Sequence, residues 1–264
     1  MWSKKLNQPR HLRTLSVTLT DVFPGIGSVL NISTILLGSV IGIFVGEKLR
    51  DKTRSLITDV LGLVTILGAA GAIAPIFKDR YLQSVPNGWS AMPILLALLV
   101  GGIVGSVLDL EDKVEKFGEY LRGKFKSKEG SFVEGFLDAS LLFAIGPLAI
   151  LGSISDGMGA GIDQLVLKST LDGFASIAFA SSLGWGVAAS AIPVGLYQGT
   201  WTLIGLLLGN ILSDYQVDVM TITGGLLLLG IGMRLLKFKL IPVGNLLPAL
   251  FLAPVFALAL HQFV

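Results

Sequence analysis

Long uncharged stretches separated by short charged segments dominate the pattern along the chain. A helix needs about 20 residues to cross a hydrocarbon core of about 30 Å, so uncharged stretches of this length indicate membrane-spanning helices. We predict spans in the residue ranges 22–46, 60–77, 81–108, 132–155, 219–233 and 240–260. Runs such as 203–209 are apolar on every side, which favours helices over the alternating strands of a membrane β-barrel.

The longest uncharged stretch covers residues 173–212 and must contain a turn. Its 40 residues would be about 60 Å long as one helix, twice the thickness of the membrane core. Proline removes a backbone donor and glycine permits unusual dihedral angles, so the segment 193–199 is the predicted corner between two spans. The predicted fold class is therefore all-α, a polytopic transmembrane helix bundle of about seven to eight spans.

A short polar tail precedes the apolar part of the chain. Residues 1–21 are basic and polar, whereas residues 22–264 hold every predicted span and no long polar block, which predicts a single transmembrane domain after the tail. The first uncharged stretch has 25 residues, longer than the roughly 7–15-residue apolar region of a cleaved signal peptide. We therefore expect an uncleaved first span.

Composition and charge give the location and the orientation. Only 14% of the residues are charged, against roughly 25% in soluble domains. The first, third and last predicted loops together hold 13 of the 20 basic residues, so by the positive-inside rule these loops face the cytoplasm and both termini lie outside the cell. The four basic residues of the tail count against this orientation, which leaves the side of the tail open. We expect a multi-pass protein of the cytoplasmic membrane.

Glycines four residues apart recur after apolar triplets in three of the predicted spans. They are Gly38 and Gly42, continued by Gly46, then Gly101 and Gly105, and finally Gly205 and Gly209. Such glycines lie on one helix face and let two helices approach closely. Each pair is followed by a span with two small residues six apart, which predicts repeated helix hairpins. Under an eight-span topology the third hairpin would be inverted, as in secondary transporters. For any single pair, ordinary tight packing of helices is the favoured explanation, and a ridge that faces lipid would favour contact between two copies of the chain.

Polar residues inside the predicted spans are the candidates for a solute or ion site. They are Asn31, Thr65, Asp138, Ser140, Asp172, Ser176, Gln198 and Asn245. Ionisable residues within spans suggest function, and Asp138 could bind a cation or a proton. The ordinary alternatives are an acid stabilised near a helix N-terminus, for Asp138 and Asp172, and interhelical hydrogen bonds worth about 0.6 kcal/mol for the amides and hydroxyls.

The chain offers little for catalysis or metal binding. It has no cysteine, and its two histidines, His11 and His261, lie far apart without a carboxylate cluster. Phosphate-binding glycine loops and the HExxH and GxSxG motifs do not occur in the sequence. We expect no enzyme, no cofactor and no metal, and no nucleic acid among the partners.

Two functions therefore remain, and they differ in the role that each gives to one charged segment of the chain. Residues 109–131 combine mixed charges with apolar side chains at helical spacing, a pattern typical of an interfacial amphipathic helix. The glycine repeats, the corner at 193–199 and the polar groups favour a transporter or channel for an ion or small solute. The alternative is a non-transporting membrane scaffold or sensor that acts through the loop 109–131.

Several longer motifs resemble a known family. They are Asn31 with the Leu-Leu-Gly-x-x-x-Gly ridge and the runs 61–65, 134–143, 149–153, 156–157, 171–176, 190–194, 197–199, 224–232 and 245–249. With them the chain resembles the bacterial membrane proteins of domain of unknown function 554 over nearly its whole length after about residue 24. The resemblance implies a multi-pass protein of the cytoplasmic membrane and carries no activity with it.

Overall fold

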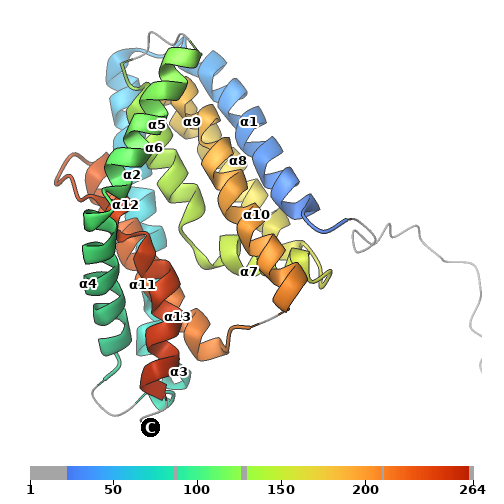
Figure 1. Ribbon diagram of the computed structural model, residues 1–264. Coiled ribbons are helices and arrows are strands. Elements are labelled where there is room, and N and C mark those ends of the chain that lie inside the picture. The colour runs from blue at the N-terminus through green and yellow to red at the C-terminus, as the bar shows by residue number, and fades with distance from the viewer. Residues whose placement is uncertain (1–22, 86–88, 126–129, 210, 262–264) are drawn as a thin grey trace, which may run out of the picture.

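The computed structural model describes residues 23–85, 89–125, 130–209 and 211–261, so the predicted tail lies outside the described residues. All regular structure in these ranges is helical, which confirms the predicted all-α fold (Figure 1). The helices are α1 (Ile26–Gly46), α2 (Asp51–Ile73), η2 (Ala74–Phe77), α3 (Asp79–Gln83), α4 (Met92–Val107), α5 (Leu110–Lys124), α6 (Phe132–Ala144), α7 (Pro147–Gly157), α8 (Asp163–Leu183), α9 (Trp185–Ala189), α10 (Ala191–Leu208), α11 (Asp214–Leu235), α12 (Val243–Leu246) and α13 (Pro248–His261).

Length and composition identify five helices in the described residues that could cross a membrane, or seven if each of two bent helix pairs is one span. The bent pairs are α4 with α5 and α6 with α7. Helix α8 is long enough, at 21 residues, but is not among these spans. It carries Lys168, Asp172 and several serines, which lower its hydropathy.

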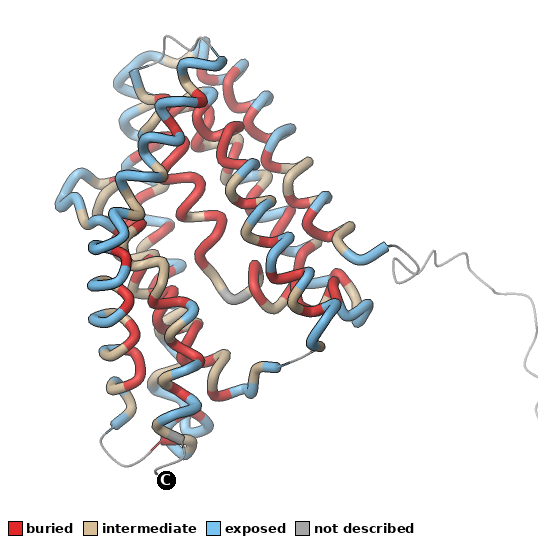
Figure 2. The backbone as a smooth tube through the Cα atoms, viewed as in Figure 1, coloured by how far each residue is buried: buried red, intermediate tan, exposed pale blue. Residues whose placement is uncertain are grey.

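The outer surface of the bundle is strongly apolar. Leu37, Leu67 and Leu207 are between 65% and 72% exposed, although a soluble protein rarely exposes large contiguous apolar patches. The buried residues line the inward faces of the helices (Figure 2). This distribution fits hydrocarbon, and not water, as the solvent around the middle of the bundle.

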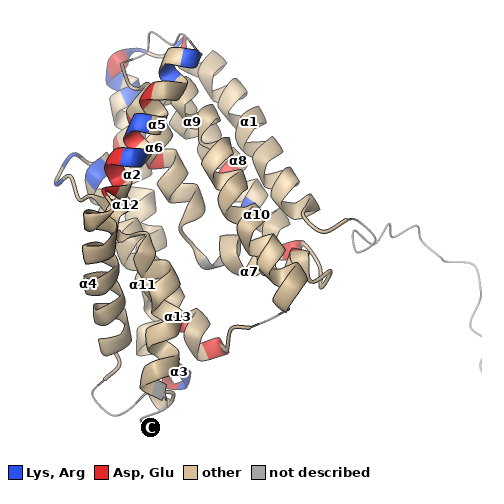
Figure 3. Ribbon diagram, in the orientation of Figure 1, with Lys and Arg blue, Asp and Glu red and all other residues tan. Residues whose placement is uncertain are grey.

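Charged side chains gather at one part of the molecule. Figure 3 shows Lys and Arg concentrated in the upper part, around the α1–α2 connection, α5 and the α11–α12 connection. The first described residues and the C-terminal end of α13 lie away from that part (Figure 1). The three basic loops therefore share one end of the bundle, as the positive-inside rule requires of loops on the same side of a membrane.

The ridge of α1 packs directly against α8. Side chains added at Gly38, Gly42 and Gly46 would overlap the carbonyl oxygens of Gly173, Ile177 and Ser181, three positions spaced four apart along α8. Only glycine lets two helix backbones lie this close, as in small-residue packing within lipid. Among the described helices, α1 and α8 thus share the most extensive contact.

The second and third predicted glycine pairs do not pack against the helices predicted to be their hairpin partners. Gly101 and Gly105 lie against the junction of α12 and α13, and Gly205 lies against α7. Gly209 ends α10 with a φ of 72°, a conformation that favours glycine, so it is a helix terminus more than a packing residue. The hairpin repeat and its inversion are therefore not confirmed, and the packed glycines already contact their own chain.

The predicted corner at 193–199 is wrong. Helix α10 runs through it without a break, because Pro193 lies in the first turn, where the missing N–H breaks no helical hydrogen bond. The chain turns instead at Gly184, whose φ of 74° and ψ of −150° suit glycine. Since α8 begins at Asp163, Asp172 lies in the middle of a helix and not at its start, which removes the helix-dipole explanation for this acid.

The predicted span 132–155 is also wrong as a continuous helix. It breaks at Ile145 and Gly146, where Gly146 has a φ of 143°, and α7 restarts with Pro147 at its first position. The two pieces differ in direction by 62°. The predicted span 81–108 is shorter than expected, because α4 covers only Met92–Val107.

A bulky side chain on the α1 ridge should separate α1 from α8. We expect Gly42→Leu to lower the free energy of unfolding by about 1–3 kcal/mol, the usual cost of overpacking. Thermal unfolding in detergent micelles measures this loss. The matched control is Gly68→Leu, because no heavy atom lies within 4 Å of a Cβ at Gly68. Equal effects of the two substitutions would contradict the packing described for α1.

Candidate functional site

A buried ion pair lies between α1 and α8. The Lys168 ammonium donates to Asp172 Oδ2 at 2.7 Å, and the Asn31 amide donates to the same oxygen at 3.0 Å. The two charged side chains are only 7% and 11% exposed. They are four residues apart on α8, the spacing at which helical side chains meet. The pair therefore neutralises two charges that the low-dielectric interior of the bundle could not stabilise separately.

Polar atoms without partners accompany this ion pair. Asn31 Oδ1, Ser176 Oγ and both amide atoms of Gln198 are buried and have no hydrogen-bond partner among the described residues. All three residues are 0% exposed. An unsatisfied buried polar group costs about 1–3 kcal/mol, so its presence requires an explanation. Asn31, Lys168 and Asp172 are in direct contact, whereas Ser176 lies one turn further along α8, against Gly38, and Gln198 lies on α10. We call these five residues the Asp172 cluster.

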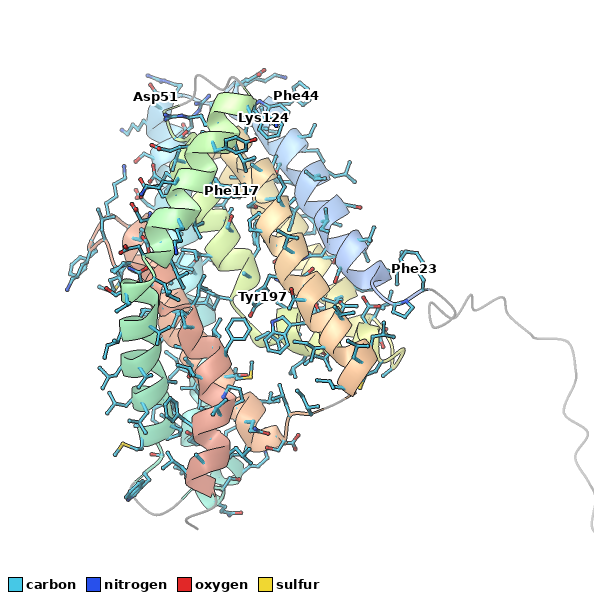
Figure 4. The ribbon with its side chains drawn as sticks, in the orientation of Figure 1. Phe23, Phe44, Asp51, Phe117, Lys124 and Tyr197 are labelled. Carbon is cyan, nitrogen blue, oxygen red and sulfur yellow. The ribbon has the colours of Figure 1, made fainter. Side chains whose placement is uncertain are left out.

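The register of α10 against α1 places Gln198 at the level of Asn31. Gly195 lies against Ile32, and Thr202 Oγ1 lies 3.3 Å from Ser28 Oγ. Gln198 is between these contacts on α10, and Asn31 is between them on α1. Figure 4 shows the neighbouring Tyr197 pointing from α10 toward the middle of the bundle. Gln198 of α10 is therefore buried at about the level of the hydrogen bond between Asn31 and Asp172.

Asp156 of α7 fixes the start of α1 near this cluster. Its two carboxylate oxygens accept hydrogen bonds from the backbone N–H groups of Gly25 and Gly27 at 3.1 and 3.0 Å. A carboxylate stabilises a helix N-terminus because it pairs with free N–H groups and with the helix dipole. The second half of the broken span therefore holds α1 in place. No spacing in the sequence pointed to Asp156.

A second set of charged and polar side chains joins α5, α6, α11 and α12. Arg234 of α11 donates from Nη1 to Glu111 Oε1 of α5 at 2.5 Å, and its Nε lies 2.9 Å from Asp138 Oδ1 of α6. Asn245 of α12 accepts a hydrogen bond from the Glu111 backbone N–H at 2.9 Å. We call Glu111, Asp138, Arg234 and Asn245 the Arg234 cluster.

The predicted site residues therefore divide into three sets. Asn31, Asp172, Ser176 and Gln198 belong to the Asp172 cluster, Asp138 and Asn245 belong to the Arg234 cluster, and Thr65 and Ser140 donate only to carbonyls of their own helices. Sequence reasoning missed Lys168, Glu111 and Arg234 because it assigned them to loops. The four-residue spacing of Lys168 and Asp172 was the one signal that could have found a pair. In the described part of the chain, no three His, Cys, Asp or Glu side chains gather as they would around a metal ion.

An ion pair also closes the end of the bundle opposite the basic loops. Arg80 Nη2 of α3 lies 2.8 Å from both carboxylate oxygens of Asp218 in α11. Hydrogen bonding to Asp218 raises the pKa of the Arg80 guanidinium further above its ordinary value. The Arg80 side chain is exposed, so this contact ties α3 to α11 at the surface.

Breaking the buried pair of the Asp172 cluster should be costly, whereas replacing it should not. We expect Asp172→Leu to lower the free energy of unfolding by about 3–5 kcal/mol, because it leaves the Lys168 ammonium buried without its partner. The double variant Lys168→Met with Asp172→Leu should recover most of that loss. Thermal unfolding in detergent, with both single variants, gives the coupling between them. Additive losses would contradict a buried ion pair.

Comparisons with known proteins place the chain among membrane proteins. Residues 26–258 match the family model described as protein of unknown function (DUF554). The chain is 29% identical to the uncharacterized membrane protein YdfK of Bacillus subtilis (strain 168), over 90% of this chain and 97% of that protein. It is 31% identical to the uncharacterized protein YqgA of Escherichia coli (strain K12), over 86% of this chain and 94% of that protein. No solved structure matches. The apolar helices and these relatives make this chain a membrane protein of the DUF554 family.

Proposed function

We propose that this protein carries a small polar solute or an ion across the membrane, between α1, α7, α8 and α10. The observation that carries the proposal is the set of buried, unpartnered polar atoms on Asn31, Ser176 and Gln198. They come from three helices and accompany an ion pair in the middle of α8. A guest molecule with donors and acceptors would satisfy them.

Simple packing does not account for these atoms. An amide or hydroxyl that only fills space could be replaced by an apolar side chain at no cost, whereas an unpartnered buried group costs about 1–3 kcal/mol. Buried polar groups of this kind are satisfied by water, ions or ligands. The cluster therefore suits a site that is occupied during part of a working cycle.

The chemistry of the Asp172 cluster favours a neutral or zwitterionic solute over a bare ion. Asn31 Oδ1 is an acceptor, while the Gln198 amide and the Ser176 hydroxyl can each donate and accept. Lys168 and Asp172 cancel each other's charge. A solute with both donors and acceptors would complete this set without leaving a net charge in the membrane.

The broken span next to the cluster supports transport as well. Helix α7, the second half of this span, packs against α10, with Gly157 close to Thr202 and Gly205 close to Ile154. Broken helices in secondary transporters place helix ends and free backbone groups at a solute site. This support rests on analogy of architecture and is weaker than the unpartnered atoms themselves.

The alternative of a scaffold acting through residues 109–131 has less support. The apolar face of α5 is already used within the chain, because the Phe117 and Phe136 rings meet edge to face at 5.9 Å and Gly118 lies against Phe136. Residues 126–129 of the loop lie outside the described residues. Packing on α6 accounts for the amphipathic pattern without a partner.

Flux into proteoliposomes tests the proposal. We expect the purified protein to admit at least one solute from a panel of small neutral, zwitterionic and ionic compounds faster than empty liposomes do. Gln198→Leu should reduce that flux about tenfold, because losing hydrogen bonds worth about 1.4 kcal/mol corresponds to this factor.

The control for this experiment lies on the same helix. Thr200 of α10 is exposed and donates only to Leu196 O, so Thr200→Val should leave the flux unchanged. Failure of every compound to enter faster than in empty liposomes would refute the transport function. A normal rate for a folded Gln198→Leu variant would refute the assigned path.

A further inference from the structure

The Arg234 cluster contains more negative than positive charge. One guanidinium, from Arg234, faces two carboxylates, from Glu111 and Asp138. The Arg234 and Glu111 side chains are 15% exposed and that of Asp138 is 0% exposed. A carboxylate without compensation costs several kcal/mol at such a site, so the surplus charge must be neutralised.

Glu111 is the better satisfied of the two acids. Its Oε1 accepts from Arg234 Nη1 at 2.5 Å, and its Oε2 accepts from the backbone N–H of Gly244 at 2.8 Å. A Cβ added at Gly244 would lie 2.9 Å from Glu111 Cα, so α12 sits directly against the start of α5. Glu111 therefore links α5, α11 and α12.

Asp138 has no comparable set of partners. Its Oδ1 is 2.9 Å from Arg234 Nε, yet neither carboxylate oxygen has a hydrogen bond from any described residue. The guanidinium N–H that donates in good geometry is directed to Glu111 instead. Asp138 is thus the group on which the surplus charge resides.

In the described part of the chain, α5 also packs on α6 and carries cations, but Lys113, Lys116 and Lys124 are exposed and Arg122 lies near the opposite end of α5 from Glu111. The charges that act on Asp138 are those of Arg234, Glu111 and Glu134, the last being an exposed acid one turn earlier on α6. Helices α9 and α10 carry no charged residue, and Lys168 of α8 is paired with Asp172. The Arg234 guanidinium, which Glu111 shares, is therefore the cation that faces Asp138 among the described residues.

We propose that Asp138 binds a proton and that this proton is the coupling ion for transport. The second part rests on the transport function proposed above, whereas the proton site itself does not. A proton suits the site better than a metal cation, because it neutralises Asp138 without placing a second cation beside the Arg234 guanidinium. Water supplies the proton on binding and accepts it on release, and no covalent bond to carbon changes.

The same geometry couples the proton to the helices. When Asp138 is protonated, Arg234 remains with Glu111, which holds α5 against α12 through Gly244. When the proton leaves, the Asp138 carboxylate attracts the same guanidinium, whose Nε lies 2.9 Å from Asp138 Oδ1, and so strengthens the contact between α6 and α11 beside the Glu111 contact. Proton binding therefore changes how strongly α6 is held to α11 and selects between two arrangements.

Infrared spectroscopy of the full protein in lipid nanodiscs tests the proton site independently of transport. At neutral pH we expect one carbonyl band of a protonated carboxylic acid, shifted by isotope labelling of aspartate and not of glutamate. Asp138→Asn should abolish this band, and Glu134→Gln should leave it unchanged. In Asp138→Glu the band should shift with isotope-labelled glutamate and not with labelled aspartate. This second variant tests the proton site even if Asp138→Asn does not fold.

Either of two results would overturn the proton site. One is a wild-type protein without any protonated aspartate at neutral pH. The other is a band that persists in Asp138→Asn. A band that behaves as expected in a protein that moves no solute would refute only the transport function, whereas solute flux without the band would refute only the proton site.

Discussion

The hydrocarbon around this bundle cannot hydrogen-bond to a polar group or stabilise a charge. Every polar side chain within the spans must therefore find a partner inside the protein or be used for something that visits it. The apolar outer faces, the glycine contacts and the pairing of nearly all buried charges follow from this constraint. Among the buried polar atoms without a hydrogen-bond partner in the described residues, those of Asn31, Ser176, Gln198 and Asp138 bear on the proposed function.

Close packing and polar chemistry are linked in the half of the bundle around α1. The glycines of α1 let α8 approach until carbonyl oxygens lie against the ridge. That approach brings Asn31 within hydrogen-bonding distance of Asp172, which already holds Lys168. Asp156, from the broken span, fixes the start of α1 beside them. The tight helix pair is thus the frame on which the polar cluster is built.

The two polar clusters differ in what they lack. The Asp172 cluster is balanced in charge but short of hydrogen bonds at Asn31, Ser176 and Gln198. The Arg234 cluster has one guanidinium for two carboxylates. A solute with donors and acceptors would complete the first, and a proton would complete the second. In the proposed coupled transport, the solute and the proton would therefore bind at separate sites, each of which joins several helices.

The features of the fold that depend on composition and local periodicity could be predicted from the sequence. Uncharged stretches were long enough to reveal the membrane helices, and the glycine spacing marked α1 as a packing helix. Turns were harder, because Pro193 is harmless in the first turn of a helix while the break falls at Gly146, within a stretch as apolar as its neighbours. The polar clusters depend on contacts between distant segments, such as Glu111 with Arg234, and no local pattern encodes them.

Access of water to the Asp172 cluster is the most direct test of the account. The chain has no cysteine, so Ser176→Cys introduces a single thiol of nearly the original size. A small water-soluble thiol reagent should modify this thiol in membranes. The control is Ala69→Cys in α2, because Ala69 is equally buried, and its thiol should not react. An inert Ser176→Cys thiol, or equal reaction at both positions, would contradict a water-accessible path through α1, α8 and α10.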